Sequence, residues 1–295
     1  MKKILIKSYA KLNLYLQVLD KRKDGFHNIF TLFERISLAD TITLRLLPGK
    51  NIKILSDSRE IPLDAANLAY KAALILQKSF NLNKGVEITI KKHIPVGSGM
   101  GGGSSNAAYT LLGLNRLWSL NLSRGQLCKI AQKLGSDVPF FIYNCPFALG
   151  EGRGERVRPL RNLSKLRLWH VVAVPRIFVS TARVYAGWDK AKKGQIVPLT
   201  SAKSNAKLLI LNLKNRDLLG VAHLLYNSLE EVTTRFYPDL VRVKKNLQKT
   251  GLQAAMMSGS GSAVFALCVS RREALKAYAK LKDKNATFYF FTQTK

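Results

Sequence analysis

The chain has 295 residues, 47% of them hydrophobic, so it can bury one large core or two ordinary ones, and its length favours about two domains. Its 48 Lys and Arg against 18 Asp and Glu give a net charge of +30, but these residues are spread along the chain rather than gathered in the blocks typical of nucleic-acid-binding tails. No segment reaches the ~18 uninterrupted apolar residues of a membrane span, and the scattered Cys128, Cys145 and Cys268 form no CxxC pair or zinc site, so we expect a cytoplasmic protein without a membrane partner.

The first part of the chain reads as a series of antiparallel strands. Apolar and polar residues alternate over four short segments, 4–6, 12–18, 29–36 and 40–44. Lys11 lies between the first two of them, and the segment 20–28 is polar and turn-forming. A helix pattern over 68–80 follows a break at 64–67, and residues 86–90 alternate again as a strand.

A glycine-rich loop separates that strand from the next helix pattern. Five of the seven residues from 97 to 103 are glycine. Glycine permits positive φ and close approach to a ligand, and the first turn of a helix offers unpaired N–H groups at the positive end of its dipole. We expect Ser104 and Ser105 to cap this helix. The order strand, loop, helix predicts a polyphosphate site rather than a flexible linker, although the loop is neither a Walker A motif nor a Rossmann fingerprint. The predicted phosphate loop comprises Pro95, Val96, Gly97, Ser98, Gly99, Met100, Gly101, Gly102, Gly103, Ser104 and Ser105.

Beyond the loop and its helix, Ser123 is the expected cap of a second helix that Gly135 closes. Asp137 follows almost at once, ahead of the apolar segment 138–149. The chain then becomes polar and basic over 155–165. We therefore predict two domains, 1–158 and 159–295.

The second half contains another small-residue loop. Met256 to Ser262 includes Gly259 and Gly261 and precedes a strand pattern over 263–269. Such a loop permits close backbone approach, either to a ligand or to the first glycine loop, and a plain tight turn is the alternative. Helix patterns cover 206–213, 218–229, 240–250 and 274–281, and a last strand pattern covers 287–292.

Two polar residues beside predicted breaks in the backbone are the candidates for chemistry on the bound phosphates. They are Lys11 and Asp137. The apolar neighbours of Asp137 favour an oriented carboxylate acceptor. From spacing alone, the alternative is that Asp137 caps the following turn.

Five motifs occur in one order at fitting separations. They are Ala10-Lys11-Leu12-Asn13-Leu14, Asp24-Gly25-Phe26-His27, Pro95 to Asn106, Leu134-Gly135-Ser136-Asp137-Val138-Pro139 and Ser258-Gly259-Ser260-Gly261-Ser262. Together they resemble the GHMP kinase superfamily, and within it the kinases of the non-mevalonate isoprenoid route that act on a cytidylyl-diphosphate sugar alcohol. The similarity covers nearly the whole chain and is strongest before residue 155. It implies an α+β fold, a two-domain sandwich with the active site in the interdomain cleft, and a kinase that uses ATP with Mg²⁺.

The resemblance also implies roles for individual residues. Asp137 would accept the proton of the substrate hydroxyl, and Lys11 would hold Asp137 ionised. The ATP phosphates would lie along Pro95 to Ser105, with the nucleotide base near Asn67. On the substrate side four residues are implied, Asn13, Phe26, His27 and Tyr185. The motifs do not identify metal ligands beyond a hydroxyl from Ser104 or Ser105.

Two residues depart from the family pattern. Ser98 replaces a glycine of the phosphate loop, and Phe26 stands where the family usually has Tyr. Neither change removes a catalytic group, because Ser98 keeps its N–H and Phe26 keeps its aromatic face. We expect Phe26 to stack on the cytosine, His27 to read the edge of the base and Tyr185 to close the other face. Coverage of Phe26 by the second domain is the alternative.

Two other functions fit parts of the sequence. One is a GHMP kinase that acts on another small alcohol. The other is a basic nucleic-acid-binding protein, which only the net charge supports, since an RNP-like strand, a zinc finger and a basic heptad region are missing from the sequence. We therefore expect no nucleic-acid partner, and the positive charge would instead attract two polyanionic substrates.

Overall fold

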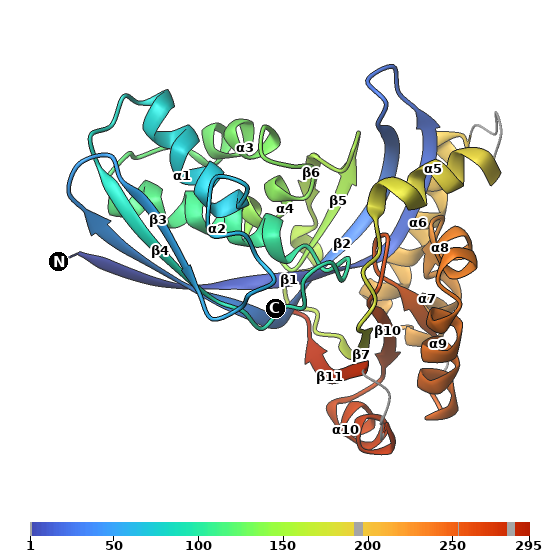
Figure 1. Ribbon diagram of the computed structural model, residues 1–295. Coiled ribbons are helices and arrows are strands. Elements are labelled where there is room, and N and C mark those ends of the chain that lie inside the picture. Colours follow the sequence, from blue (N-terminus) through green and yellow to red (C-terminus); the bar gives the residue numbers. More distant parts are fainter. Residues whose placement is uncertain (1, 192–196, 253, 282–286) are drawn as a thin grey trace.

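The computed structural model describes residues 2–191, 197–252, 254–281 and 287–295. It has two lobes side by side, one coloured blue to green and the other yellow to red (Figure 1). The first two strands are long enough to extend from one lobe into the other. Both lobes combine a sheet with helices, which confirms the α+β class.

The described strands are β1 (Lys3–Lys21), β2 (His27–Leu47), β3 (Ile52–Ser56), β4 (Gly85–Lys91), β5 (Phe147–Glu151), β6 (Arg156–Pro159), β7 (Trp169–Pro175), β8 (Tyr226–Asn227), β9 (Ala255–Met257), β10 (Val264–Cys268) and β11 (Thr287–Gln293). The described helices are α1 (Leu68–Ser79), α2 (Gly102–Leu117), α3 (Arg124–Gln132), α4 (Val138–Tyr143), a 3₁₀ turn η1 (Arg161–Leu163), α5 (Thr181–Ala191), α6 (Leu199–Asn215), α7 (Leu218–Leu224), α8 (Glu230–Phe236), α9 (Asp239–Lys249) and α10 (Arg271–Lys280).

The larger sheet has the order β3-β4-β2-β1-β8, with β5 also paired to β2 and β6 paired to β5. The prediction of four short strands in the first 44 residues was wrong, because β1 and β2 are continuous. Their antiparallel register shifts between Tyr9 and Lys11 and again between Asn13 and Tyr15. A β-bulge interrupts the apolar alternation without ending the strand, so the sequence pattern shows a break where the backbone has none.

Helices α1 to α4 cover one face of the larger sheet, where a cluster of buried side chains joins them to β2, β3 and β4. The smaller sheet has the order β11-β7-β10-β9, and its two central strands, β7 and β10, are buried on both faces. Along β7, Val172 and Val174 pack toward the long strands and α6, whereas Val171 and Ala173 pack toward α9 and α10. This alternation is what a strand between two packed layers requires.

Several helix ends differ from the predicted ones. Ser104 and Ser105 do not cap α2, because the helix already begins at Gly102 with Gly101 in the left-handed conformation (φ +71°) at its N-cap. Ser123 caps α3 as predicted, and it does so through a capping box with Gln126. The C-cap of α3 is Lys133, so Gly135 lies two residues after the cap and not directly after it as predicted. The helix predicted over 218–229 is interrupted by β8, which pairs with β1. Pairing across the fold therefore overrides the local helical pattern.

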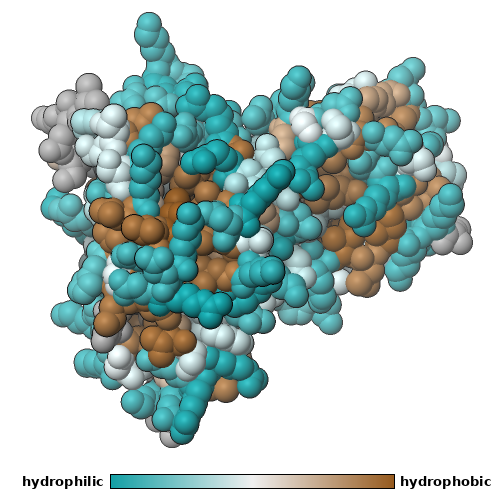
Figure 2. Space-filling model, turned by 180° about the vertical axis from the view of Figure 1, so that it is seen from behind, coloured by the Kyte–Doolittle hydropathy of each residue, from teal (hydrophilic) through white to brown (hydrophobic). Residues whose placement is uncertain are grey.

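The predicted domain boundary after residue 158 falls within β6 and stays a prediction. Seen from behind, hydrophobic side chains form separate patches on both lobes within a largely hydrophilic surface (Figure 2). Among the helices of the described residues, none is long and apolar enough to cross a membrane.

Candidate active site

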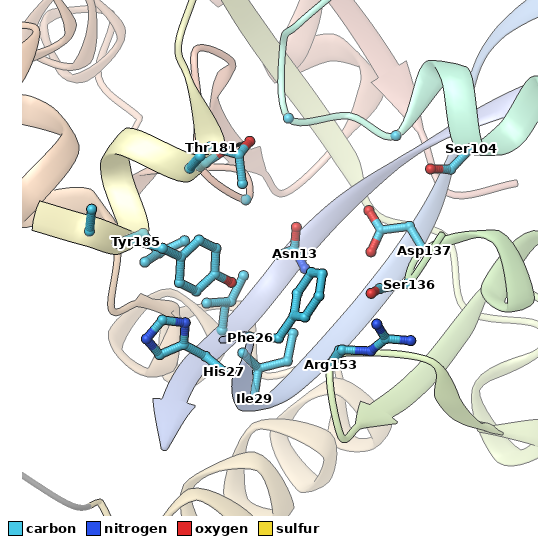
Figure 3. A pocket seen from close by; sticks show the side chains of 18 of the residues that line it. Asn13, Phe26, His27, Ile29, Ser104, Ser136, Asp137, Arg153, Thr181 and Tyr185 are labelled. Atoms are coloured by element: carbon cyan, nitrogen blue, oxygen red, sulfur yellow. Dashed lines mark hydrogen bonds between the residues drawn. The ribbon is translucent and has the colours of Figure 1, made fainter. Parts of the chain in front are cut away.

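Two cavities meet at the glycine loop before α2. The larger, of about 640 Å³, lies between the lobes, and the smaller, of about 340 Å³, lies between the loop and the start of α1. Gly99, Gly101 and Ser104 line both of them. Figure 3 shows Ser104 and Asp137 at one end of the larger cavity, and His27 and Tyr185 at the other. The loop thus separates two binding volumes and is open to each.

The two glycine loops are in contact, as one of the two interpretations of the second loop predicted. Gly99 has a φ of +75°, and a Cβ atom there would lie 2.3 Å from the carbonyl oxygen of Ser258. Ala263 N–H donates to the Ser98 carbonyl at 2.9 Å. Gly259 lines the larger cavity, and Gly261 braces its own loop by donating to the Ser258 carbonyl at 3.0 Å. The loop from the C-terminal lobe therefore fixes the position of the phosphate loop.

Nine of the eleven predicted loop residues line the smaller cavity. Met100 and Ser105 do not, because both are fully buried. The Ser105 hydroxyl donates to the Tyr9 carbonyl at 2.6 Å and lies 2.7 Å from the Ser8 hydroxyl. The Ser105 hydroxyl is therefore used in hydrogen bonds within the protein. Of the two serines proposed to offer a hydroxyl to a metal ion, only Ser104 faces the cavities.

Two predicted residues, one within the loop and one beside it, have structural roles. Ser98, the departure from the family pattern, donates its hydroxyl to the Pro95 carbonyl at 2.7 Å and so braces the loop. Asn67 lines the smaller cavity and also caps α1, since its side chain accepts from Ala69 N at 2.9 Å and donates to the Pro62 carbonyl at 2.8 Å. The cap fixes the orientation of this wall of the cavity.

Beneath the loop lies a buried carboxylate that sequence reasoning missed. Asp40, fully buried on β2, accepts from the backbone N–H groups of His93 and Ile94 at 2.7 and 2.8 Å. It also accepts from Asn106 Nδ2 at 2.9 Å and pairs with the Lys92 ammonium group. These partners lie on both sides of the phosphate loop, so one side chain holds both of its ends.

The two candidates for chemistry come together at the larger cavity. Lys11 Nζ lies 3.5 Å from Asp137 Oδ2 and donates to Asn13 Oδ1 at 2.5 Å. The Lys11 side chain is only 4% exposed, whereas that of Asp137 is 30% exposed and faces the cavity. The Lys11 N–H donates to the Met100 carbonyl at 3.0 Å, which joins the bulged β1 to the glycine loop. Asp137 occupies the N-cap position of α4 but makes no capping hydrogen bond, so its carboxylate is available to a ligand.

At the other end of the cavity is an aromatic corner formed by Phe26, His27 and Tyr185. Phe26 is 53% exposed and is not covered by the second lobe; instead the Arg153 guanidinium lies 4.8 Å from its ring centre. Tyr185 stacks on His27, with 4.9 Å between the ring centroids. His27 Nε2 lies 2.6 Å from Asp189 Oδ1. Burial, together with the negative charge of Asp137, raises the pKa of the Tyr185 phenol, which therefore stays neutral.

Sequence reasoning missed several residues that line the larger cavity, among them Lys21, Arg153, Thr181 and Asp189. Asp189 lies one helical turn after Tyr185, on the same face of α5. The prediction of Tyr185 as a substrate residue could therefore have led to Asp189 through this i, i+4 spacing. Arg153 lies in a glycine turn without a periodic pattern, and no local signal marks it. Within the described residues, no cluster of three or more His, Cys, Asp or Glu side chains could hold a metal ion by itself.

Comparisons with known proteins agree with this geometry. The model of the GHMP kinases N terminal domain matches residues 67–145, and that of the GHMP kinases C terminal domain matches residues 209–287. A 4-diphosphocytidyl-2-C-methyl-D-erythritol kinase of Geobacillus kaustophilus is 41% identical over 266 residues, which are 90% of this chain and 88% of the relative. One of Bacillus mycoides is 41% identical over 265 residues, with the same coverage of both chains.

Solved structures show the same relationship. A 4-(cytidine 5'-diphospho)-2C-methyl-D-erythritol kinase superimposes with a TM-score of 0.78 at 32% identity, covering 99% of this chain and 100% of the other. A mevalonate kinase of L. major, at 20% identity and a TM-score of 0.76 with 99% and 97% coverage, shares the fold. The chain therefore belongs to the GHMP kinases and, within them, to the family of the 4-diphosphocytidyl-2-C-methyl-D-erythritol kinases.

Proposed function

We propose that the protein transfers the γ-phosphoryl group of ATP to a hydroxyl of 4-diphosphocytidyl-2-C-methyl-D-erythritol, giving the 2-phosphate on the non-mevalonate route to isoprenoid precursors in the cytoplasm. The observation that carries the proposal is the position of the Lys11–Asp137 pair, at the larger of two cavities that share the glycine loop. The identity of the substrate follows from the relatives, which are named 4-diphosphocytidyl-2-C-methyl-D-erythritol kinases.

The smaller cavity is assigned to ATP. The base of ATP lies toward Asn67. The phosphates of ATP lie along the loop at the start of α2, where backbone N–H groups and the helix dipole favour anions. Mg²⁺ prefers oxygen ligands and is usually held by substrate phosphates with few protein groups, a donor set that the Ser104 hydroxyl and the Asp137 carboxylate fit. When bound, the ion would neutralise charge that develops on the phosphoryl oxygens.

The larger cavity is assigned to the cytidylyl substrate. Its reacting hydroxyl lies beside Asp137, which orients it and accepts its proton. The buried ammonium of Lys11 lies 3.5 Å from that carboxylate and orients it, and Lys11 is itself held by its hydrogen bond to Asn13. The cytosine lies at the far end, where Phe26 stacks on it and His27 hydrogen-bonds its edge. Tyr185 supports this corner through its stacking on His27, and its closure over the second face of the base remains a prediction.

The test measures ADP release by the purified protein with ATP, with and without the cytidylyl substrate. We expect turnover that depends on this substrate and stops in excess EDTA. Equal turnover with mevalonate or homoserine in its place would reject the assigned substrate, and activity that survives EDTA would reject the metal-assisted chemistry.

A further inference from the structure

Two charged side chains, Lys21 and Asp189, hold the His27 ring in place. Lys21 and His27 are directly paired residues of β1 and β2, and Asp189 reaches them from α5. Asp189 Oδ2 lies 2.5 Å from Lys21 Nζ, and Asp189 Oδ1 lies 2.6 Å from His27 Nε2. The ring is stacked on Tyr185 and meets Trp188 edge-on at 5.6 Å. His27 therefore has one fixed orientation at the wall of the larger cavity.

This arrangement decides which ring nitrogen carries the proton. Desolvation alone would raise the pKa of Asp189, but the hydrogen bonds from Lys21 and His27 hold that pKa below its ordinary value, so the group is a carboxylate. An ionised carboxylate only accepts hydrogen bonds, and Nε2 must therefore be the protonated nitrogen. In the neutral imidazole the second ring nitrogen, Nδ1, is then the hydrogen-bond acceptor, with a free lone pair.

We propose that Asp189, held by Lys21, sets the tautomer of His27 and thereby makes this site select cytosine over uracil. The proposal rests on the function proposed above. Cytosine carries an exocyclic amino group, a donor, at the position where uracil carries a carbonyl oxygen, an acceptor. Among the residues that the structure describes, no group is hydrogen-bonded to His27 Nδ1. A lone pair on Nδ1 can accept from the amino group but repels the carbonyl. Asp189 acts through His27 and is a positioning residue for specificity.

The substitution Asp189→Asn tests this logic directly. The Lys21 ammonium can only donate hydrogen bonds, so it donates to the amide oxygen of the new asparagine side chain. The amide N–H₂ group of that side chain then faces His27. Nε2 then becomes the acceptor and the proton moves to Nδ1. The ratio of kcat/KM for the cytidylyl substrate to that for its uridylyl analogue should fall by roughly 10–100-fold, the usual effect of leaving one buried hydrogen-bonding group unpaired.

The experiment combines this ratio with the ¹⁵N chemical shifts of the histidine side chains, which report the protonated nitrogen directly. The chain has four histidines, and His27→Gln identifies the signal of His27. Asp20→Asn is the matched control, because Asp20 accepts a hydrogen bond from Asn28 in the same hairpin without lining the cavity. We expect a protonated Nε2 in the wild type and in Asp20→Asn, a protonated Nδ1 in Asp189→Asn, and an altered ratio in Asp189→Asn alone.

Several outcomes would overturn the inference. A wild-type His27 protonated on Nδ1 would do so whether or not the enzyme turns over, and so would an unchanged substrate ratio in Asp189→Asn. Thermal unfolding of each variant shows whether it is folded, and the ¹⁵N spectrum still decides the tautomer if Asp189→Asn has lost activity. If the wild type turned over neither substrate, both the proposed function and the inference on cytosine selection would fail. If the wild type is active but the substrate ratio is unchanged in Asp189→Asn, only the inference fails.

Discussion

The contact between the two glycine loops predicts a large effect of a single methyl group. In Gly99→Ala the new Cβ would lie 2.3 Å from the Ser258 carbonyl oxygen and 2.8 Å from that of Gly261, at a residue whose φ is +75°. The left-handed conformation alone costs an alanine roughly 1–2 kcal/mol. Both obstructing atoms are backbone, so they cannot rotate away, and the two loops must separate. We therefore expect a total loss of about 2–4 kcal/mol in the free energy of unfolding.

The same displacement should impair catalysis. The phosphate loop would move away from Lys11 and Asp137, and a misplacement of about 1 Å can cost roughly 100-fold in rate. Steady-state kinetics should show a higher KM for ATP and a lower kcat, and thermal denaturation should show a lower Tm. Gly125→Ala is the matched control: nothing lies within 4 Å of its Cβ position in the exposed first turn of α3, so it should stabilise the protein by about 0.5–1 kcal/mol without affecting kinetics. A Gly99→Ala protein with wild-type Tm and wild-type KM for ATP would refute the reasoning.

Four further predictions concern the charges and the aromatic corner. Asp137→Asn should lower kcat by roughly 10²–10⁴-fold with little change in ATP affinity, and Lys11→Met should act similarly; near-normal kcat in Asp137→Asn would contradict its role. Phe26→Ala should raise KM for cytidylyl and uridylyl substrates about equally, because stacking tolerates any base, whereas His27→Ala should narrow the gap between them; an intact gap would place base reading elsewhere. Asp40→Asn places an amide donor opposite the Lys92 ammonium, so a hydrogen bond that holds the loop is lost. The KM for ATP should therefore rise more than the KM for the cytidylyl substrate, and an equal rise in both would point to a general loss of structure. Moderate salt should lower kcat/KM more than kcat if the positive charge steers the two polyanionic substrates, and an equal loss of both would point to damage to the fold or to the chemical step.

Local sequence patterns predicted much of the first lobe. The helix at 68–80, the strand at 86–90 and the N-cap at Ser123 are all present, because helix periodicity, strand alternation and caps depend on residues a few positions apart. The five motifs in order also identified the family, which the comparisons then showed.

The sequence by itself predicted an anion-binding role for the loop, since five glycines between a strand and a helix favour an anion, and it nominated Lys11 and Asp137. Only the tertiary structure decided how these groups meet. The bulges of β1, the contact of Gly99 with Ser258, and the bonds from Asp40 to both ends of the loop join residues that lie far apart in the chain. The hydrogen bond between His27 and Asp189 likewise joins residues 162 positions apart in the chain. Such contacts leave no periodic trace in the sequence, because their partners are chosen by packing and by the need to satisfy buried polar groups.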